Sequence, residues 1–384
     1  MKILHVIPYF SPKFGGPVTS TRMACQKLTE RGHEVTILTT DFCLDPTQVK
    51  PLDNIEVVSI PCKFHVGLFL YSPKMKAWLS QNISKYDIIH LQDYRSYQNA
   101  IVSDCAKVLG IPYVLQARGS VLPFFEKQLL KNCFDLVWGK KILEGAEKII
   151  ALTEVEAVQY GKMGVPRDKI VIIPNGIDLM LYNCMPSKGL FKSKYGIPQE
   201  EKMVLFLGRV HKIKGIDLLI EAFSTISSEM SNVKLVVVGP DDGYLEDLQK
   251  QILQLDIAEK IIFTGPIYGE EKLSAYVDAD VYVLPSLSEA FPNTVLEAWT
   301  CGTPVIVTES CGGISKIVQE AGIVIKRDSD ELARGIKRLL LDGAFSRECC
   351  KKGETLIKNE FNSESVIAKI EDCYRRVIRH GMMN

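Results

Sequence analysis

Two carboxylates beside the start of a predicted helix are the residues of this sequence best suited to chemistry. Glu289 and Glu297 have seven residues between them. Pro292-Asn293 is typical of a helix start, and Gly302 of a helix end. The N–H groups and the dipole of a first helical turn favour an anion, whereas carboxylates at the same place favour hydroxyl groups. A nucleotide sugar offers both, so the pattern predicts that its diphosphate binds the amides and its ribose and hexose hydroxyls bind the glutamates.

A structural interpretation of the same residues stays open. Thr294-Val-Leu-Glu297 matches a capping box, in which Glu297 bonds back to the N–H of Thr294. Glu289 can also be a solvated side chain.

Two cations in an earlier loop suit a diphosphate. Arg209 and Lys214 lie between a strand, Met203–Leu207, and a helix, Ile216–Ser227. A charge-assisted hydrogen bond contributes about 1.5–3 kcal/mol, more than an exposed ion pair does. The competing interpretation is that both are solvated loop charges.

Composition places these motifs in a two-domain protein. A chain of 384 residues suits two domains of roughly 150–200 residues each. Its 46 basic and 46 acidic residues cancel, which argues against a broad nucleic-acid-binding surface. Eleven scattered cysteines without a C-x-x-C pair indicate a reducing compartment. With no apolar run of about 18 residues and no signal peptide, we expect a cytoplasmic protein, and peripheral contact with the inner membrane surface stays open.

The chain opens with the pattern of a Rossmann-like domain. A strand at Ile3–Ile7 precedes a loop with Gly15 and Gly16, and a helix at Val18–Glu30 leads to a strand at Glu34–Thr39. No G-x-G-x-x-G is present, so a nicotinamide cofactor is not indicated. The glycine pair can also serve only to make a turn.

Strands and helices alternate along the rest of the chain. This predicts parallel sheets covered by helices on both faces, with ligands at the carboxyl ends of the strands. Further predicted strands are Ile55–Ile60, Ile88–Leu91, Tyr113–Leu115, Lys148–Ala151, Ile170–Ile173, Leu235–Val238, Ile261–Phe263, Val281–Leu284, Pro304–Val307 and Ile323–Ile325. Further predicted helices are Pro73–Ser84, Ser96–Leu109, Thr153–Met163, Ser329–Leu341, Phe345–Lys358 and Ser363–Arg379.

Two apolar segments have a possible role at a lipid surface. Leu122–Leu143 is helix-prone and mixes aromatic and aliphatic residues with lysines, as an interfacial helix does. His65–Tyr71 is similarly apolar. Ordinary packing is the alternative for both.

Two signatures resemble those of one enzyme family. E-x7-E followed by E-A-x-x-C-G-T-P-V-I, from Glu289 to Ile306, is similar to the signature of retaining GT-B glycosyltransferases of the group 1 type, family 4. The segment Gly208-Arg209-x4-Lys214-Gly215 resembles the family's second signature. The resemblance implies two Rossmann-like, doubly wound α/β domains that face each other across a cleft. It implies an acceptor domain at 1–185, a donor domain at 186–362 and a C-terminal helix, 363–384, that crosses back. The prolines and glycines within Asn183–Gln199 indicate that the linker lies there.

The resemblance also implies roles for individual residues. Arg209 and Lys214 would hold the donor diphosphate and Glu289 the hexose hydroxyls, which makes these three the predicted catalytic set. Glu297 would hold the ribose. The other predicted donor contacts are Gly15, Gly16, Ile267, Tyr268, Phe291, Asn293 and Thr294.

The acceptor side departs from the family pattern. His90 resembles a family histidine at a strand end, with a structural histidine as the alternative. Near Arg118 many members have a histidine, so this chain replaces a candidate acid–base with a fixed cation. The planar fork of an arginine suits phosphate or carboxylate; a salt-bridged surface arginine is the alternative.

The implied reaction is the transfer of a hexose from a UDP- or GDP-sugar to a sugar or lipid-linked acceptor, with retention, for a cell-envelope polysaccharide or a glycolipid. The mechanism that the resemblance implies is front-face substitution, in which the leaving phosphate accepts the acceptor's proton. No D-x-D pair stands in a suitable loop, so neither a metal nor a cofactor is expected. A nucleotide-sugar epimerase, a phosphorylase and a non-catalytic binding subunit are the alternatives.

Overall fold

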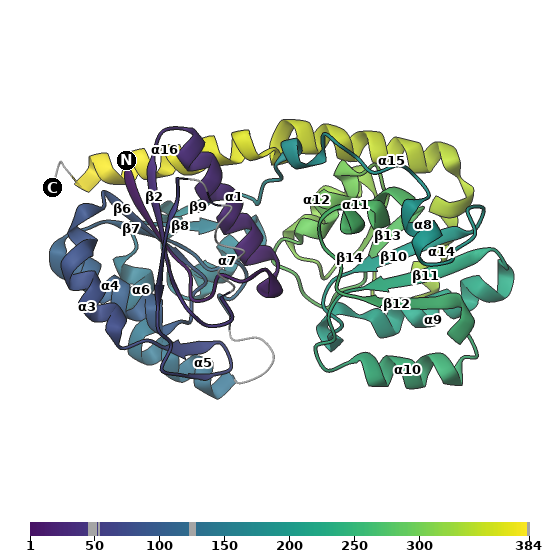
Figure 1. Cartoon of the computed structure of the whole chain (residues 1–384), viewed down its shortest axis with the longest axis horizontal. Helices are drawn as coiled ribbons and strands as arrows, with labels where there is room; N and C mark the ends of the chain where they lie inside the picture. Colours follow the sequence, from purple (N-terminus) through teal and green to yellow (C-terminus); the bar gives the residue numbers. More distant parts are fainter. Residues whose placement is uncertain (45–51, 53, 123–127, 382–384) are drawn as a thin grey trace. The chain divides into compact units, whose positions relative to one another are not determined.

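The computed structural model describes residues 1–44, 52, 54–122 and 128–381, which form two compact units (Figure 1). One is Met1–Gly176 with the chain from Ser363 onward, and the other is Ile177–Asn362. The chain therefore passes between the units at Gly176–Ile177, and not at the expected 185/186. The expected linker region belongs to the second unit, because the N–H groups of Gly189 and Lys192 donate to the buried carboxylate of Asp278.

The first unit contains a seven-stranded parallel sheet with the strand order β3-β2-β1-β6-β7-β8-β9. Successive side chains of a strand point to opposite faces. Ile88 accordingly packs on one face and Ile89 on the other, and both faces are covered. This explains why the strands are continuous apolar runs. The strands are β1 (Lys2–Val6), β2 (Glu34–Thr40), β3 (Glu56–Ile60), β6 (Ile88–Gln92), β7 (Tyr113–Gln116), β8 (Lys148–Ala151) and β9 (Ile170–Ile172).

Helices cover both faces of this sheet, as the alternating pattern predicts. Residues of α1 (Gly16–Glu30) and α16 (Ser363–Gly381) share one core cluster. Residues of α3 (Lys74–Asn82), α4 (Tyr97–Leu109), α6 (Lys140–Gly145) and α7 (Glu154–Lys162) share the other (Figure 1).

The C-terminal helix α16 belongs to the first unit. Its apolar face, with Val366, Ile370 and Tyr374, is buried in the core beneath it. On its polar face, Glu371 accepts from Arg31 of the α1–β2 turn at 2.9 Å. The arginines around Glu371 hold the pKa of its carboxyl down at about 2.

The helix-prone stretch Leu122–Leu143 is not one regular helix. It contains α5 (Gln128–Phe134), one turn of π-helix η3 (Asp135–Gly139) and then α6; its part at 123–127 lies outside the described residues. Gly139 packs so closely on the Tyr94 hydroxyl that a Cβ would overlap it. The stretch 64–71 forms an antiparallel hairpin of β4 (Phe64–Val66) and β5 (Phe69–Tyr71).

The second unit repeats the plan with a six-stranded parallel sheet of order β12-β11-β10-β13-β14-β15. The strand order reverses direction between β10 and β13, and this is the point where ligands bind in doubly wound sheets. The strands are β10 (Lys202–Leu207), β11 (Val233–Val238), β12 (Ile261–Gly265), β13 (Val281–Leu284), β14 (Val305–Thr308) and β15 (Ile323–Ile325).

Figure 1 shows α9 and α10 on one side of this sheet and α11 and α12 on the other. The sequence predicts α9, α12, α14 and α15 but not α8, α10, α11 or α13. The helices are α8 (Leu190–Lys194), α9 (Ile216–Glu229), α10 (Leu245–Gln254), α11 (Gly269–Asp278), α12 (Asn293–Thr300), α13 (Gly313–Ala321), α14 (Ser329–Leu341) and α15 (Gly343–Leu356), which ends in a π-turn, η8 (Ile357–Phe361).

Candidate active site

Two loops meet where the strand order of the second sheet reverses. One follows β10 and carries Arg209 and Lys214, and the other follows β13 and carries Glu289. The loops are joined by a main-chain bond from Leu287 N–H to the Ile213 carbonyl, 2.8 Å long. The fold therefore brings both sequence motifs to one edge of the sheet.

Gly215 allows this close approach. It adopts the left-handed conformation, with φ +67°, between the loop and α9. A Cβ on Gly215 would overlap the carbonyl oxygen of Pro285 in the neighbouring loop. Glycine is thus required both for the backbone conformation and for the contact.

Lys214 and Glu289 form an ion pair at this junction. Lys214 Nζ lies 2.5 Å from Glu289 Oε1, and the Ser286 hydroxyl donates to the same oxygen at 2.7 Å. The two side chains are only 17% and 12% exposed. Glu289 is therefore not the solvated side chain of the alternative interpretation. The pair presents a cation and an anion side by side, which suits a ligand with phosphate and hydroxyl groups.

Arg209 has a different partner. Its guanidinium pairs with Asp242 after β11, and both side chains are exposed. An exposed ion pair contributes about 0–1 kcal/mol, so an anionic ligand can displace Asp242 at little cost.

The helix α12 begins at Asn293 with Pro292 as its N-cap residue. Pro292 offers no side-chain acceptor, and no side-chain cap is formed there. The first-turn N–H groups and the helix dipole make this end of α12 favourable for negative charge.

Glu297 does not form the capping box. Its carboxylate accepts from Lys272 Nζ at 2.8 Å and from the Tyr276 hydroxyl at 3.0 Å, both on α11. Glu297 is buried, and burial, followed by the Glu297 charge, raises the pKa of Tyr276 well above its usual range. Lys272 and Tyr276 are not marked by any sequence motif, because the E-A-x-x-C-G signature points to Glu297 alone.

The other predicted donor contacts in the second unit differ in exposure. Tyr268 precedes α11 and is exposed, while Ile267 beside it is buried. Phe291 is buried too, with its ring 5.7 Å from that of Phe361. Its side chain thus packs in the core and does not present its ring to a ligand.

Gly15 and Gly16 lie at the start of the 15-residue helix α1, after β1. Gly15 has φ +67°, and an added Cβ would meet nothing within 4 Å. The backbone conformation requires this glycine, and the exposed main chain there is open to a ligand.

Arg118 follows β7, one strand beyond the reversal of strand order between β1 and β6, and has φ +52°. Its Nε donates to Gln92 at 2.8 Å and its Nη1 to Asn175 at 2.9 Å. Burial lowers the pKa of Arg118 to about 10, so it stays charged at neutral pH. The described bonds go to two amides, so Arg118 is not the salt-bridged surface arginine of the alternative interpretation.

His90 lies in the core, and its assignment to the acceptor side is not supported. Its Nδ1 is 2.6 Å from the Tyr374 hydroxyl of α16, and its ring lies 4.8 Å from that of His5. Burial, with the nearby His5 and Arg118, lowers the pKa of His90 well below its usual range. This environment fits the structural alternative for the histidine.

Among the described residues, no group of three or more His, Cys, Asp or Glu side chains is arranged to hold a metal ion. No described helix has the length and apolar character needed to span a bilayer.

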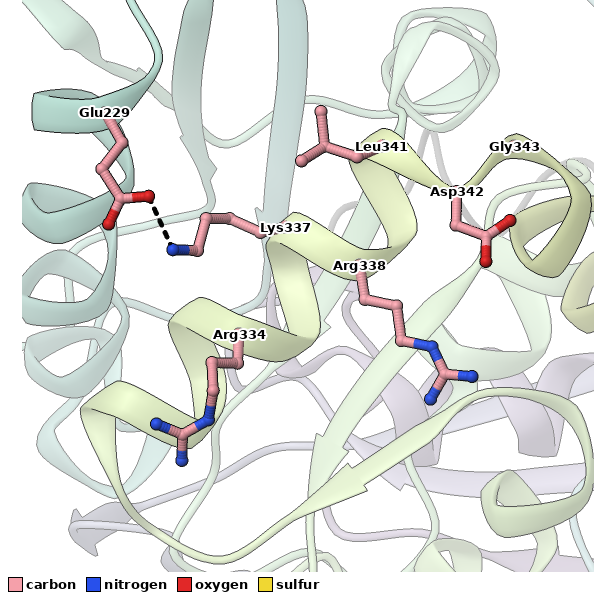
Figure 2. A pocket seen from close by; sticks show the side chains of 7 residues that line it. All are labelled: Glu229, Arg334, Lys337, Arg338, Leu341, Asp342 and Gly343. Carbon is pink, nitrogen blue, oxygen red and sulfur yellow. Dashed lines mark hydrogen bonds and ion pairs between the residues drawn. The ribbon is translucent and has the colours of Figure 1, made fainter.

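A separate hollow lies beside α14 (Figure 2). It is lined by Arg334, Lys337 and Arg338 of this helix and by Glu229 of α9, which pairs with Lys337 at 2.7 Å. None of the predicted site residues lines it.

Both halves of the chain match one family of proteins. Residues 187–359 match glycosyl transferases group 1, and residues 14–181 match glycosyltransferase family 4. The chain is 27% identical to an uncharacterized glycosyltransferase of Methanocaldococcus jannaschii over 98% of both chains. It is 32% identical to the alpha-monoglucosyldiacylglycerol synthase of Streptococcus pneumoniae, over 78% of this chain and 68% of that protein. Anabaena HepE, solved in complex with UDP-glucose, shares the fold with a TM-score of 0.83, at 20% identity over 98% of this chain and 100% of that one.

Proposed function

The chain belongs to the group 1, family 4 glycosyltransferases and has their GT-B fold, and we propose that it transfers a hexose from a UDP- or GDP-sugar to a hydroxyl acceptor. The transfer retains the configuration at the anomeric carbon. The product is a cell-envelope polysaccharide or a glycolipid.

The observation that carries this proposal is the Lys214–Glu289 pair at the reversal point of the second sheet. Without a ligand, the two charges neutralise each other. When a sugar nucleotide binds, its diphosphate replaces Glu289 as the partner of Lys214. Glu289 then accepts hydrogen bonds from the hexose hydroxyls.

Catalysis rests on stabilising the leaving diphosphate. The bond from the anomeric carbon to the phosphate oxygen breaks, and the acceptor oxygen bonds to that carbon on the same face. The proton of the acceptor hydroxyl passes to the departing phosphate. Lys214, Arg209 and the first turn of α12 at Asn293 and Thr294 neutralise the negative charge that develops there.

The rest of the donor is bound by residues around this centre. Glu297 accepts hydrogen bonds from the ribose hydroxyls, while Lys272 and Tyr276 fix the orientation of the Glu297 carboxylate. Ile267 and Tyr268 contact the base. Main-chain groups of Phe291 complete the donor contacts of the second unit.

The acceptor binds on the first unit near Arg118. The described bonds of Arg118 use Nε and Nη1, which leaves Nη2 for a phosphate or carboxylate oxygen. A lipid-linked or sugar acceptor with such a group fits this cation. The name of the Streptococcus relative, a synthase of a glucosyl diacylglycerol, supports a glycolipid product.

Donor consumption with and without acceptor tests the proposal. UDP-glucose, the ligand of the Anabaena structure, and GDP-mannose are incubated with the protein and a bacterial lipid extract, and product configuration is read by NMR. Acceptor-dependent release of UDP or GDP with a retained anomer, unaffected by EDTA, is expected. Donor conversion without acceptor would indicate an epimerase, binding without consumption would indicate a binding subunit, and an inverted anomer would refute retention.

A further inference from the structure

One face of the α5–η3 segment in the first unit is apolar and exposed. Leu129, Leu130, Leu136 and Val137 are between 48% and 82% exposed. The spacing of seven from Leu129 to Leu136, and from Leu130 to Val137, places them on the same outward side of the helix. Phe134 of this segment points inward and is buried. A helix face directed to water alone would be polar.

The β4–β5 hairpin adjoins this segment and is also apolar on its exposed side. Phe64, Val66 and Leu68 are about half exposed. The ring of Phe69 in the same hairpin packs edge-on against Phe134 of α5, with 6.5 Å between centroids. We call the exposed side chains of 63–68 and 129–141 the apolar–basic surface.

The charges of this surface have one sign. Lys63, Lys140 and Lys141 are exposed there. Asp135 is the one carboxylate in 61–72 and 128–143, and it is buried in an ion pair with Arg95 at 2.6 Å. The surface therefore presents aliphatic and aromatic side chains beside lysines, and the exposed carboxylate of Glu144 lies just beyond its end on α6.

This combination fits an anionic lipid bilayer better than a protein. Lysine is depleted at protein–protein interfaces, and a second copy of the chain would bring lysines against lysines. At a bilayer, by contrast, leucine, valine and phenylalanine enter the interface while lysines contact anionic headgroups. Each lysine near such a surface strengthens binding about fivefold.

We propose that the apolar–basic surface docks the first unit on an anionic bilayer. This proposal rests on the proposed function in one respect only, namely that the docked enzyme takes a lipid-linked acceptor from that bilayer. The docking itself is independent of catalysis.

Vesicle flotation tests the docking. The protein should float with vesicles of phosphatidylcholine and phosphatidylglycerol at low salt and be released by added salt. It should stay at the bottom with phosphatidylcholine alone. A Leu129→Ser, Leu136→Ser double variant and a Lys140→Glu, Lys141→Glu double variant should each lose most of the floating fraction. All four side chains are exposed, so both variants should keep the wild-type melting temperature.

Leu253→Ser is the matched control, because Leu253 of α10 is 71% exposed in the second unit; it should float like the wild type. Donor consumption measured in detergent should be the same in all variants. A wild type that stays at the bottom with anionic vesicles, or surface variants that float like it, would overturn the docking. A wild type that self-associates, and that the Leu129→Ser change converts to monomers, would also overturn the docking. Flotation without donor use would leave the docking intact and reject the catalytic proposal.

Discussion

Replacing Lys214 by alanine should lower kcat by about 10²–10³, or about 2.7–4 kcal/mol, the effect of losing one preorganised donor to a developing anion. Lys214 Nζ is positioned 2.5 Å from Glu289 in a largely buried junction. Little reorganisation is therefore needed when the diphosphate takes the place of that carboxylate. The alanine also leaves Glu289 with Ser286 as its remaining partner, which should cost about 1–3 kcal/mol of stability.

The assay is the initial rate of UDP or GDP release at saturating donor, together with the melting temperature of each variant. Lys212→Ala is the matched control, since Lys212 is exposed and lies in the same 3₁₀ turn, Lys212–Lys214. It should keep its rate within twofold. Arg209→Ala should resemble Lys214→Ala in rate but not in stability, because its ion pair is exposed. Rates within threefold of wild type for both Lys214→Ala and Arg209→Ala would refute the diphosphate clamp.

Three further predictions test separate parts of the structure. Glu297→Ala should weaken nucleotide binding more than it lowers kcat, since ribose contacts are similar in ground and transition states. Lys272→Met should have the same effect, but a weaker one. Calorimetry that shows normal nucleotide affinity in both variants would reject the ribose role of Glu297. Gly215→Ala should destabilise the second unit by more than about 1 kcal/mol and lower activity, because the left-handed backbone and the tight contact both exclude a Cβ; an unchanged denaturation midpoint would contradict this. Burial lowers the pKa of His5 to about 3 and that of His90 well below its usual value of 6.5, so the unfolded chain binds more protons below pH 6.5. The contribution of these two histidines to the free energy of unfolding is therefore fully present above that pH. It should fall as the pH drops, by up to about 1.4 kcal/mol per pH unit for each histidine. Urea denaturation from pH 7 to 5 should show this fall, and a His90→Gln variant should show a smaller one.

The sequence assigned Lys214 and Glu289 to the same donor, and the structure places these residues, 75 positions apart, in one ion pair. Apolar runs bounded by glycine and proline place each residue in a loop after a strand, and parallel strands bring such loops to one edge of the sheet. The glycine after Lys214 marks the tight turn. Local pattern and sheet topology are sufficient for this part of the site.

Side-chain partners were less predictable, because they depend on which distant element packs there. His90 lies within β6 and Arg118 follows β7. The first is buried against α16, and the second is held by the side-chain amides of Gln92 and Asn175. Lys272 on α11 has no local feature that separates it from a solvated lysine. The pairing of Phe291 with Phe361 likewise joins residues 70 positions apart, which no periodicity reveals.

The domain boundary was misplaced for a similar reason. Prolines and glycines between Asn183 and Gln199 are typical of a linker. In the structure they surround the short helix α8, whose start is fixed by the Asp278 carboxylate. A distant buried acid thus decides which unit contains the segment.

Calorimetric titration of UDP and GDP into the wild type and into Lys214→Ala tests the central claim most directly, namely that the β10–β13 junction holds the diphosphate of a sugar donor. We predict that one of the two nucleotides binds the wild type at a single site. Its affinity should fall at least tenfold in Lys214→Ala and stay unchanged in Lys212→Ala. Failure of both nucleotides to bind, or equal affinity in the wild type and Lys214→Ala, would contradict the claim.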